Sequence, residues 1–279
     1  MALPRYPVYV ISKGRASSCL TANFLARDGV PFQLVVEPQE TAAYAARYGA
    51  SAVVTLPFSN LGKGSMPARN WCWEDAKTAG AKRHWILDDN IGQIRRLYRG
   101  FRIPCQSGPA FAAVEDFVDR YTNVPVAGMN YQMFVTPTSP AYRTNVHVYS
   151  CLLIENAVDY RWRLRYNEDT DLCLQVLNAG HATILVNAFM VDKKTTMTMK
   201  GGNSDELYQG DGRLRMARAL ERVWPGIVSV DWRYGRPQHV VDWSALPRRN
   251  EYGLRLREIK PVRHARLRTL VESFAGQEA

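Results

Sequence analysis

The first half of the chain alternates short apolar runs with stretches of helical periodicity. Apolar runs at 7–12, 32–36 and 53–56 predict buried strands, and the segments 17–27 and 41–48 between them predict helices, the first capped by Ser17 or Ser18. Connections this short favour a parallel, doubly wound α/β sheet. Ligands of such sheets bind beyond the carboxyl ends of the strands. The residues expected at that edge are Ser12, Glu37, Pro57 and Asp88.

The stretch 65–90 combines a helix with a buried strand that ends in Asp88-Asp89-Asn90. Pro67 suits the first helical turn, where its missing N–H is not needed, and Gly80 ends the helix. Two carboxylates and an amide at the carboxyl end of a strand suit a hard divalent cation, which prefers oxygen ligands. A polar turn accounts for the same three residues about equally well, because turns favour Asp and Asn.

Glycine and basic residues occur in three further segments. The loop NLGKGS (60–65) is either a mobile connector or a phosphate loop in which backbone N–H groups and Lys63 meet a diphosphate. The segment 91–102 is a strand or hairpin whose four arginines form either a solvated face or a basic wall beside a nucleotide. In 192–203, Lys193, Lys194 and Lys200 either fold over a diphosphate or lie on an exposed basic turn.

A second acidic cluster, YNEDTD at 166–171, precedes a helix that ends at Gly180. Asn167 is expected to cap this helix, and acids in a first turn offset the helix dipole. Three acids in four residues exceed what capping needs, so a chemical role is the alternative. The remaining predicted elements are a helix at 109–121, strands at 126–134, 146–154 and 182–191, a loop at 136–145 interpreted as an acceptor-side flap, and a helix at 210–224.

Composition narrows the class of protein. The chain has 279 residues, 46% hydrophobic and 22% charged, which fits one large soluble domain with or without an extension. No apolar run is long enough to span a bilayer, and the first residues lack a signal-peptide layout, so we expect a cytoplasmic protein. Five scattered cysteines without a CxxC pair predict reduced, mostly buried thiols.

Charge is concentrated near the C-terminal end. The formal net charge is +10, and the segment 246–268 contains eight Lys or Arg against two Glu, which is more than half of the surplus. A charge run is usually a solvated face. One this concentrated, with Trp243 and Tyr252 nearby, is more typical of a surface that binds a polyanion.

Several of these motifs together resemble a known family. Ala68-Arg69-Asn70, a helix, Gly80, an apolar strand and Asp-Asp-x are similar to the nucleotide-sugar signature of A-type glycosyltransferases, especially the large family-2 group. The family's usual ending is Asp-x-Asp, and here the last position is Asn90, a neutral oxygen ligand. With SKGR, NLGKGSMPARN, WILDDN, NEDTDLC and KGGN in this order, the chain is most similar to phage glycosyltransferases encoded beside TET/JBP-type DNA oxygenases.

The resemblance implies both a fold and an activity. The fold is α/β of the GT-A type, a Rossmann-like, mostly parallel sheet with flanking helices over 1–203, followed by a basic helical C-terminal extension at 204–279. The activity is that of a metal-dependent hexosyltransferase in phage DNA modification. It moves a sugar from a nucleotide sugar, with a UDP-sugar favoured, to the hydroxyl of a 5-hydroxymethylpyrimidine in DNA, with 5-hydroxymethylcytosine favoured. The implied cofactor is Mn²⁺ or Mg²⁺.

The resemblance also implies a set of site residues. The family's carboxylate at the helix start is the acceptor-side base in inverting members, so Asp169 is the preferred base, with Asp171 and Glu168 in support. The implied metal ligands are Asp88, Asp89 and Asn90. The implied donor-binding residues are Ser12, Arg15, Glu37, Lys63, Arg69, Asn70, Asp88 and Lys200. The implied DNA contacts are Arg248, Arg249, Arg255, Arg257 and Arg263.

Three other functions fit parts of the sequence. A glycosyltransferase for a small molecule or glycan would leave the basic tail with another role. A nucleotidyltransferase shares the doubly wound sheet, the glycine loop and the carboxylates. A DNA-binding protein without catalysis would leave the two acidic motifs unexplained.

Overall fold

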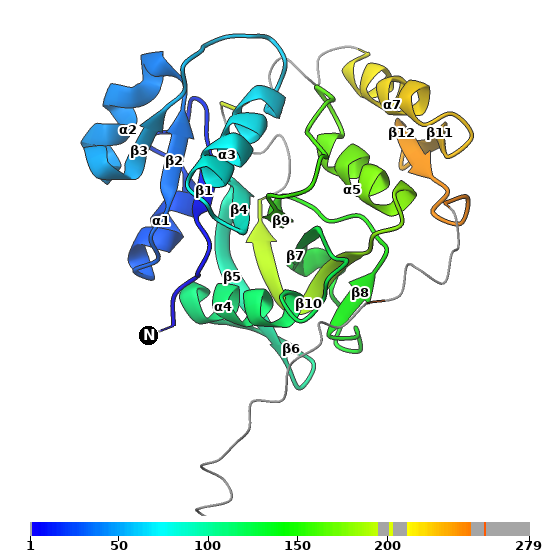
Figure 1. Ribbon diagram of the computed structural model, residues 1–279, viewed down its shortest axis with the longest axis horizontal. Helices are drawn as coiled ribbons and strands as arrows, with labels where there is room; N and C mark the ends of the chain where they lie inside the picture. The colour runs from blue at the N-terminus through cyan, green and yellow to red at the C-terminus, as the bar shows by residue number, and fades with distance from the viewer. Residues whose placement is uncertain (1, 195–200, 203–210, 247–253, 255–279) are drawn as a thin grey trace, which may run out of the picture.

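The computed structural model describes residues 2–194, 201–202, 211–246 and 254. Within these ranges ten strands form one sheet, in the order β3-β2-β1-β4-β9-β7-β10-β5-β6, with β8 paired to β10 (Figure 1). The strands are β1 (Val8–Ile11), β2 (Gln33–Val36), β3 (Val53–Thr55), β4 (Arg83–Asp88), β5 (Ile91–Tyr98), β6 (Phe101–Pro104), β7 (Val126–Tyr131), β8 (Tyr142–Thr144), β9 (Cys151–Glu155) and β10 (Thr183–Lys193).

Most of these strands run in one direction. β1 is parallel to β2 and β4, β2 to β3, and β7 to β10. β9 is antiparallel to both β4 and β7, and β5 and β8 are antiparallel to β10. The predicted α/β fold, a large Rossmann-like sheet with flanking helices, is therefore confirmed. In the described part of the chain, no helix combines the length and the apolar character that crossing a membrane requires.

Helices cover both faces of the sheet. α1 (Leu20–Arg27) and α4 (Ser107–Val118) pack on one face, and α3 (Met66–Thr78) and α5 (Glu168–Asn178) pack on the other. Alternate residues of the central strands enter the two layers, because side chains of a strand point to opposite faces in turn. Val10, Trp85 and Leu87 belong to the first layer, and Tyr9 and Ile86 belong to the second.

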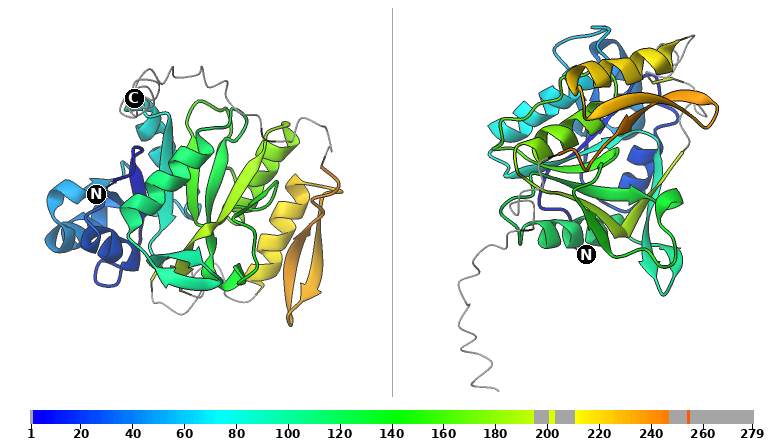
Figure 2. Two further views of the ribbon diagram at one scale, coloured as in Figure 1. Left: turned by 90° about the horizontal axis from the view of Figure 1, so that it is seen from below. Right: turned by 90° about the vertical axis from the view of Figure 1, so that its right-hand side faces the viewer.

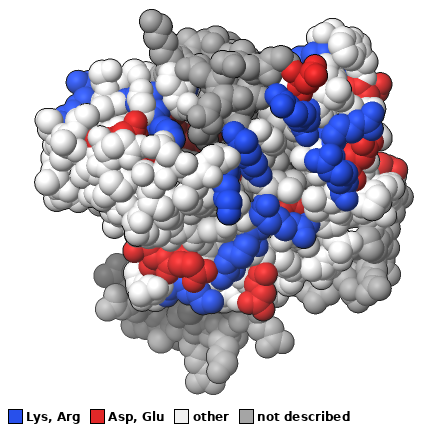
Figure 3. All heavy atoms as spheres, turned by 90° about the horizontal axis from the view of Figure 1, so that it is seen from above, with Lys and Arg blue, Asp and Glu red and all other residues white. Residues whose placement is uncertain are grey.

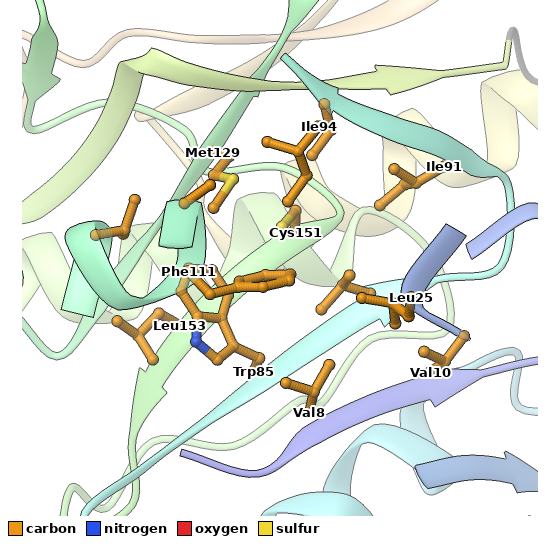
Figure 4. Packing of buried hydrophobic residues seen from close by; sticks show 14 of the residues in the cluster. Val8, Val10, Leu25, Trp85, Ile91, Ile94, Phe111, Met129, Cys151 and Leu153 are labelled. Atoms are coloured by element: carbon orange, nitrogen blue, oxygen red, sulfur yellow. The ribbon is translucent and has the colours of Figure 1, made fainter. Parts of the chain in front are cut away.

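Trp85 and Phe111 lie at the centre of the first layer (Figure 4). Their rings meet edge to face with centroids 4.7 Å apart. The indole N–H of Trp85 donates to Glu115 Oε1 at 2.8 Å, so its one polar group is satisfied inside the core. The apolar runs that predicted β1, β4 and β9 therefore form part of the hydrophobic core. This core lies beneath the carboxyl ends of β1 and β4.

The helix α2 (Thr41–Tyr48) and the helix α7 (Gly212–Val223) lie at opposite ends of the molecule (Figures 1 and 2). α7 packs beside a two-stranded sheet of β11 (Val228–Arg233) and β12 (Arg236–Val241). Leu220 of α7 and Val228 share a small core with Leu174 and Leu177 of α5. The described part of the extension is therefore joined to the catalytic core through α5.

Two details differ from the predictions. The N-cap of α1 is Cys19 rather than Ser17 or Ser18, and it makes no side-chain capping bond. The predicted flap at 136–145 contains β8, because its residues pair with β10. The described part of 204–279 contains the hairpin β11–β12 beside the helix α7. The prediction of reduced cysteines is confirmed, since all five are free and four are buried.

We predict that Gly128→Ala destabilises the sheet where β7 meets β9. A Cβ at this position would lie 2.2 Å from the carbonyl oxygen of Cys151 and 2.6 Å from Val148. Such overpacking typically costs about 1–3 kcal/mol. Chemical denaturation should show a free energy of unfolding lowered by at least about 1 kcal/mol.

Gly92→Ala is the matched control for this change. Gly92 lies in β5, and a Cβ there would come no closer than 3.6 Å to another atom, the carbonyl oxygen of Asp192. An equal loss of stability in both variants would contradict the packing argument.

Candidate active site

The carboxyl ends of the parallel strands open into a cavity of about 410 Å³. The loop 60–65 and the first residues of α3 and α5 close its sides, and Met216 of α7 reaches its edge. The charged residues that line it are Lys13, Arg15, Glu37, Arg69, Asp88, Asp89, Arg165, Glu168, Asp169 and Lys193.

Asp88, the last residue of β4, lies between two cations. Its Oδ1 accepts from Arg69 Nη2 at 2.7 Å, and its Oδ2 accepts from Lys193 Nζ at 2.8 Å. Lys193 also donates to the hydroxyls of Tyr131, at 3.0 Å, and Ser150. Burial alone would raise the pKa of Asp88, but Lys193 and Arg69 outweigh it and lower the pKa to about 2. Both Asp88 and Lys193 are therefore charged at neutral pH.

Asp89 is buried and bound to the turn that follows β1. It accepts from Ser12 Oγ at 2.7 Å and from the guanidinium of Arg15, whose other terminal nitrogen donates to the carbonyl of Gly201 at 2.8 Å. A Cβ on Gly202 would come within 2.8 Å of Arg15, and Gly202 has φ +76°. Only glycine permits this approach. The pair Gly201-Gly202 thus lies directly against the Arg15 turn.

Glu37, just after β2, links that turn to the loop 60–65. It lies 3.0 Å from Lys13 Nζ and accepts the backbone N–H of Asn60 at 3.0 Å. Burial would raise the pKa of Glu37, but the hydrogen bonds from Lys13, Gln39 and Asn60 outweigh it and lower the pKa. Glu37 is an ionised carboxylate at the rim of the cavity, at the carboxyl end of the strand next to β1.

Arg69 of α3 joins the two acidic motifs. Its side chain is 4% exposed, its Nη2 donates to Asp88, and its Nε lies 3.4 Å from Glu168 Oε1. Ser65 Oγ accepts from Arg69 Nε at 3.1 Å and donates to the same Glu168 oxygen at 2.8 Å. The guanidinium lies over the ring of Trp162, 4.8 Å from its centroid. The strand end of β4 and the first turn of α5 are thereby held in one network.

The pKa values of the first two acids of α5, Glu168 and Asp169, are shifted in opposite directions. Burial raises the pKa of Glu168, and Arg69 offsets only part of this. Asp169 Oδ2 lies 3.1 Å from His147 Nε2, and Oδ1 accepts the backbone N–H of Thr170 at 2.8 Å. Burial alone would raise the pKa of Asp169, but His147, Arg69 and Thr170 outweigh it and hold the pKa well below its usual range. Asp169 is therefore ionised at neutral pH.

The described residues do not fit a divalent cation at Asp88-Asp89-Asn90. All four carboxylate oxygens of the two acids already accept hydrogen bonds, mostly from cations. Asn90 Oδ1 is a buried oxygen without a partner among the described residues, but one oxygen is far from a ligand set. No group of three or more His, Cys, Asp or Glu in the described ranges is arranged to hold a metal. Mn²⁺ or Mg²⁺ stays a prediction.

The structure brings most of the predicted site residues into the cavity. They are Ser12, Arg15, Glu37, Arg69, Asp88, Asp89, Asn90, Glu168 and Asp169. Lys63 is exposed and does not line the cavity, although its loop does. Six further predicted residues lie outside the described part of the chain. They are Lys200, Arg248, Arg249, Arg255, Arg257 and Arg263.

Asn70 and Asp171 are corrections to the predicted site. The side-chain amide of Asn70 makes two hydrogen bonds with the backbone of Trp162, at 2.7 and 3.1 Å. Asp171 is fully buried, accepts three hydrogen bonds from Arg163, and accepts the indole N–H of Trp224 at 2.7 Å. Neither residue lines the cavity. Successive helical residues differ by about 100° in direction, so neighbours of a site residue face elsewhere.

Sequence reasoning missed Tyr131, Ser150 and His147. Tyr131 and Ser150 line the cavity and bind Lys193, while His147 binds Asp169. Tyr131 ends an apolar strand, so the rule that placed Asp88 could have found it. Ser150 and His147 precede a strand rather than follow one, and no signal in the sequence marks them.

A cavity at the carboxyl ends of a Rossmann-like sheet, with cations on one side and an ionised carboxylate on the other, suits a transferase that uses an anionic donor. Residues 6–202 match the model of a family described as TET-Associated Glycosyltransferase. The chain belongs to this family and is a glycosyltransferase. A nucleotide-sugar donor follows from the family.

One solved structure similar to this chain is that of a candidate nucleotide-diphospho-sugar transferase from Desulfovibrio desulfuricans G20. It shares 9% sequence identity, with a TM-score of 0.39 over 80% of this chain and 99% of the other. No curated protein matches the chain.

We predict that the Asp88 network makes folding stability fall in acid. The pKa of Asp88 in the folded protein is lowered to about 2, below its value in an unfolded chain, so its contribution is complete above about pH 4. It is lost as the pH falls toward 2, and amounts to about 2 kcal/mol. Denaturation between pH 5 and pH 2 should show this loss in the wild type, and Asp88→Asn should show a flatter profile.

Asp159→Asn, at an exposed position, is the control. A wild-type profile that coincides with that of Asp88→Asn over this range would show that the two cations do not act on Asp88 as the geometry implies.

Proposed function

We propose that this glycosyltransferase moves a hexose from a nucleotide sugar, favoured as a UDP-sugar, to the hydroxyl of a 5-hydroxymethylpyrimidine in DNA. 5-Hydroxymethylcytosine is the favoured base, and the setting is phage DNA modification in the host cytoplasm. The observation that carries the proposal is the network through Arg69. Arg69 joins Asp88, which lies beside the cations, to Glu168, the neighbour of the ionised Asp169, and all four residues line one cavity. The family's association with TET enzymes supports DNA as the acceptor.

The nucleoside of the donor lies at the end formed by β1 and β2. Ser12, Arg15 and Glu37 come from adjacent strand ends and line the cavity beside Asp88. Glu37 is ionised and accepts hydrogen bonds, so it suits a ribose hydroxyl or a base N–H. The loop 60–65 covers this end, and its contact with Glu37 through Asn60 fixes its position.

The diphosphate lies against Lys193, Arg69 and Arg15, the buried cations that line the cavity. Stabilising negative charge on the departing nucleoside diphosphate is the main electrostatic demand of the reaction. Fixed cations in a site shielded from water meet this demand without reorganisation during the reaction. In this proposal the three cations take the place of the predicted Mn²⁺ or Mg²⁺ at the diphosphate.

Asp169 is the base. As the acceptor oxygen forms its bond to the anomeric carbon, the hydroxyl proton passes to Asp169. The bond from that carbon to the diphosphate oxygen breaks, and its electron pair leaves with the nucleoside diphosphate. Asp169 is held ionised by His147 and Arg69, so it can accept a proton at neutral pH. Glu168, which Ser65 and Arg69 bind, supports the network from the adjacent position.

DNA is held by charge. Lys and Arg side chains form a band across the face seen from above, and Asp and Glu lie mostly at its margins (Figure 3). The segment 246–268, predicted to contact DNA through its arginines, adds to the same surplus in sequence. Contacts to phosphate supply affinity without sequence information, so modification should be broad rather than site-specific. The affinity should fall steeply with salt, with a log–log slope of about −0.9 per phosphate contact.

We predict transfer to DNA that contains hydroxymethylated pyrimidines, and none to unmodified DNA of equal length at equal salt. Mass spectrometry of the nucleosides, after incubation with a panel of nucleotide sugars, measures this transfer.

Asp169→Asn preserves shape but removes basicity, so it should lower kcat by roughly 10²-fold or more with donor binding retained. Asp171→Asn is the matched control, because Asp171 is buried outside the cavity. It should lower the free energy of unfolding, whereas kcat of the folded enzyme should change little.

Two results would overturn this function. Equal transfer to modified and unmodified DNA would mean that the hydroxymethyl group is not the acceptor. Transfer to a small hydroxylated acceptor alone would favour a glycosyltransferase for small molecules or glycans. If Asp171→Asn loses turnover while Asp169→Asn keeps it, the assignment of the base is wrong.

We also predict that Lys193→Ala lowers kcat/KM by roughly 10²-fold, the scale for removing one group that stabilises the transition state. Wild-type activity should persist in excess chelator. Lys194→Ala, next along the chain and exposed, is the control and should change little. Lys193→Arg should recover part of the activity. Loss of activity in chelator that Mn²⁺ restores would show instead that a metal neutralises the diphosphate.

A further inference from the structure

An aromatic cluster extends from the cavity toward the surface. Tyr131 is the last residue of β7, and Phe134 is the last residue of the short 3₁₀ helix η3 (Gln132–Phe134). His147 and Tyr149 lie shortly before β9. The rings of Tyr131 and Tyr149 stack with centroids 4.7 Å apart, and those of Tyr131 and Phe134 stack at 5.9 Å. The ring centroids of His147 and Tyr149 are 4.3 Å apart. We call these four residues the aromatic platform.

The inner end of the platform is part of the active site. Tyr131 lines the cavity, and its hydroxyl lies 3.0 Å from Lys193 Nζ. His147 lies 3.1 Å from the carboxylate of Asp169. The platform therefore touches both the cation assigned to the diphosphate and the carboxylate assigned as the base.

The outer end of the platform is exposed. Phe134 is 53% exposed, and its neighbour Met133 is 55% exposed. Tyr131 and Tyr149 are explained by packing, whereas Phe134 keeps more than half of its surface in water. Other exposed aromatic side chains among the described residues, such as Phe101 and Trp232, lie on hairpins that do not line the cavity. Phe134 does not line the cavity itself, but its ring stacks on Tyr131, which does, so an exposed aromatic surface lies next to the cavity.

We propose that the aromatic platform stacks the acceptor pyrimidine after it leaves the DNA helix, with Phe134 as the ring that the base meets. This inference rests on the proposed function. The acceptor hydroxyl must come within hydrogen-bond reach of Asp169, which lies in the cavity, so the base must be extruded. A single methylene separates that hydroxyl from the pyrimidine ring. The ring must therefore lie near Asp169, to which the platform is joined through His147.

Stacking also agrees with how the DNA is held. Every base has a π-face, so aromatic stacking tolerates different sequences, and phosphate contacts are equally indifferent to sequence. The specificity that remains is chemical: only a pyrimidine with a hydroxyl one carbon from the ring places an oxygen at Asp169.

The test compares Phe134→Ala with Phe101→Ala, since Phe101 is 72% exposed on β6, away from the cavity. The acceptor is an oligonucleotide with one 5-hydroxymethylpyrimidine. Phe134→Ala should raise KM for this DNA by about 5- to 100-fold, the range for loss of one base–aromatic stack. KM for the donor and donor hydrolysis without DNA should not change. The salt slope should not change either, because no phosphate contact is lost.

Two further variants separate stacking from general packing. Phe134→Trp keeps an aromatic face and should retain a low KM for DNA, whereas Phe134→Leu keeps apolar bulk and should behave like the alanine variant. Thermal unfolding checks that all variants fold. Equal KM values for Phe134→Ala and Phe101→Ala, or full activity of Phe134→Leu, would overturn the inference. Absence of transfer to the oligonucleotide by the wild type would instead overturn the proposed function.

Discussion

The active site depends on one buried ion network, centred on Arg69. A guanidinium that is almost entirely buried is costly unless it is paired, and here Asp88, Glu168 and the ring of Trp162 share that task. These partners come from different elements, so the network fixes α3 against the end of β4 and the start of α5. The loop 60–65 leads directly into α3, and its position is set by the same arrangement. One network therefore holds the loop 60–65, the end of β4 and the acidic first turn of α5 together.

The charges of the cavity are balanced among its described lining residues. The acids Glu37, Asp88, Asp89, Glu168 and Asp169 face the cations Lys13, Arg15, Arg69, Arg165 and Lys193. Lys13 pairs with Glu37, Arg15 with Asp89, and Arg69 and Lys193 with Asp88, and such pairing lets charges persist in a partly buried site. It also explains why the two adjacent aspartates are poor metal ligands in this arrangement: their oxygens are already used. Burial raises the pKa of Glu168, whereas His147 and Arg69 outweigh burial at Asp169 and lower its pKa.

The antiparallel strand β9 contributes to the cavity through the residues that precede it. It lies between β4 and β7 and runs against both, so its beginning, not its end, lies at the edge where the parallel strands finish. Ser150 precedes it and lines the cavity, while Tyr149 and His147 lie against the lining residues Tyr131 and Asp169. In a purely parallel sheet that position would be filled by a residue that follows a strand. The aromatic platform and the partner of Asp169 are consequences of this reversal.

Local pattern alone determined the fold class, the strands β1 to β4 with their polar ends, and the two acidic motifs, because the periods of strands and helices are written in neighbouring residues. The same pattern placed Ser12, Glu37 and Asp88 at one edge of the sheet, and the family resemblance added Arg69 and Asp169. Only the tertiary structure decided what each of them touches. It paired Asp88 with Lys193, more than a hundred residues away, and it turned Asp171 and Asn70 away from the cavity. It also brought His147 to Asp169. Such choices depend on strand order and on the rotation of a helix about its axis, and neither property is encoded in a short stretch of sequence.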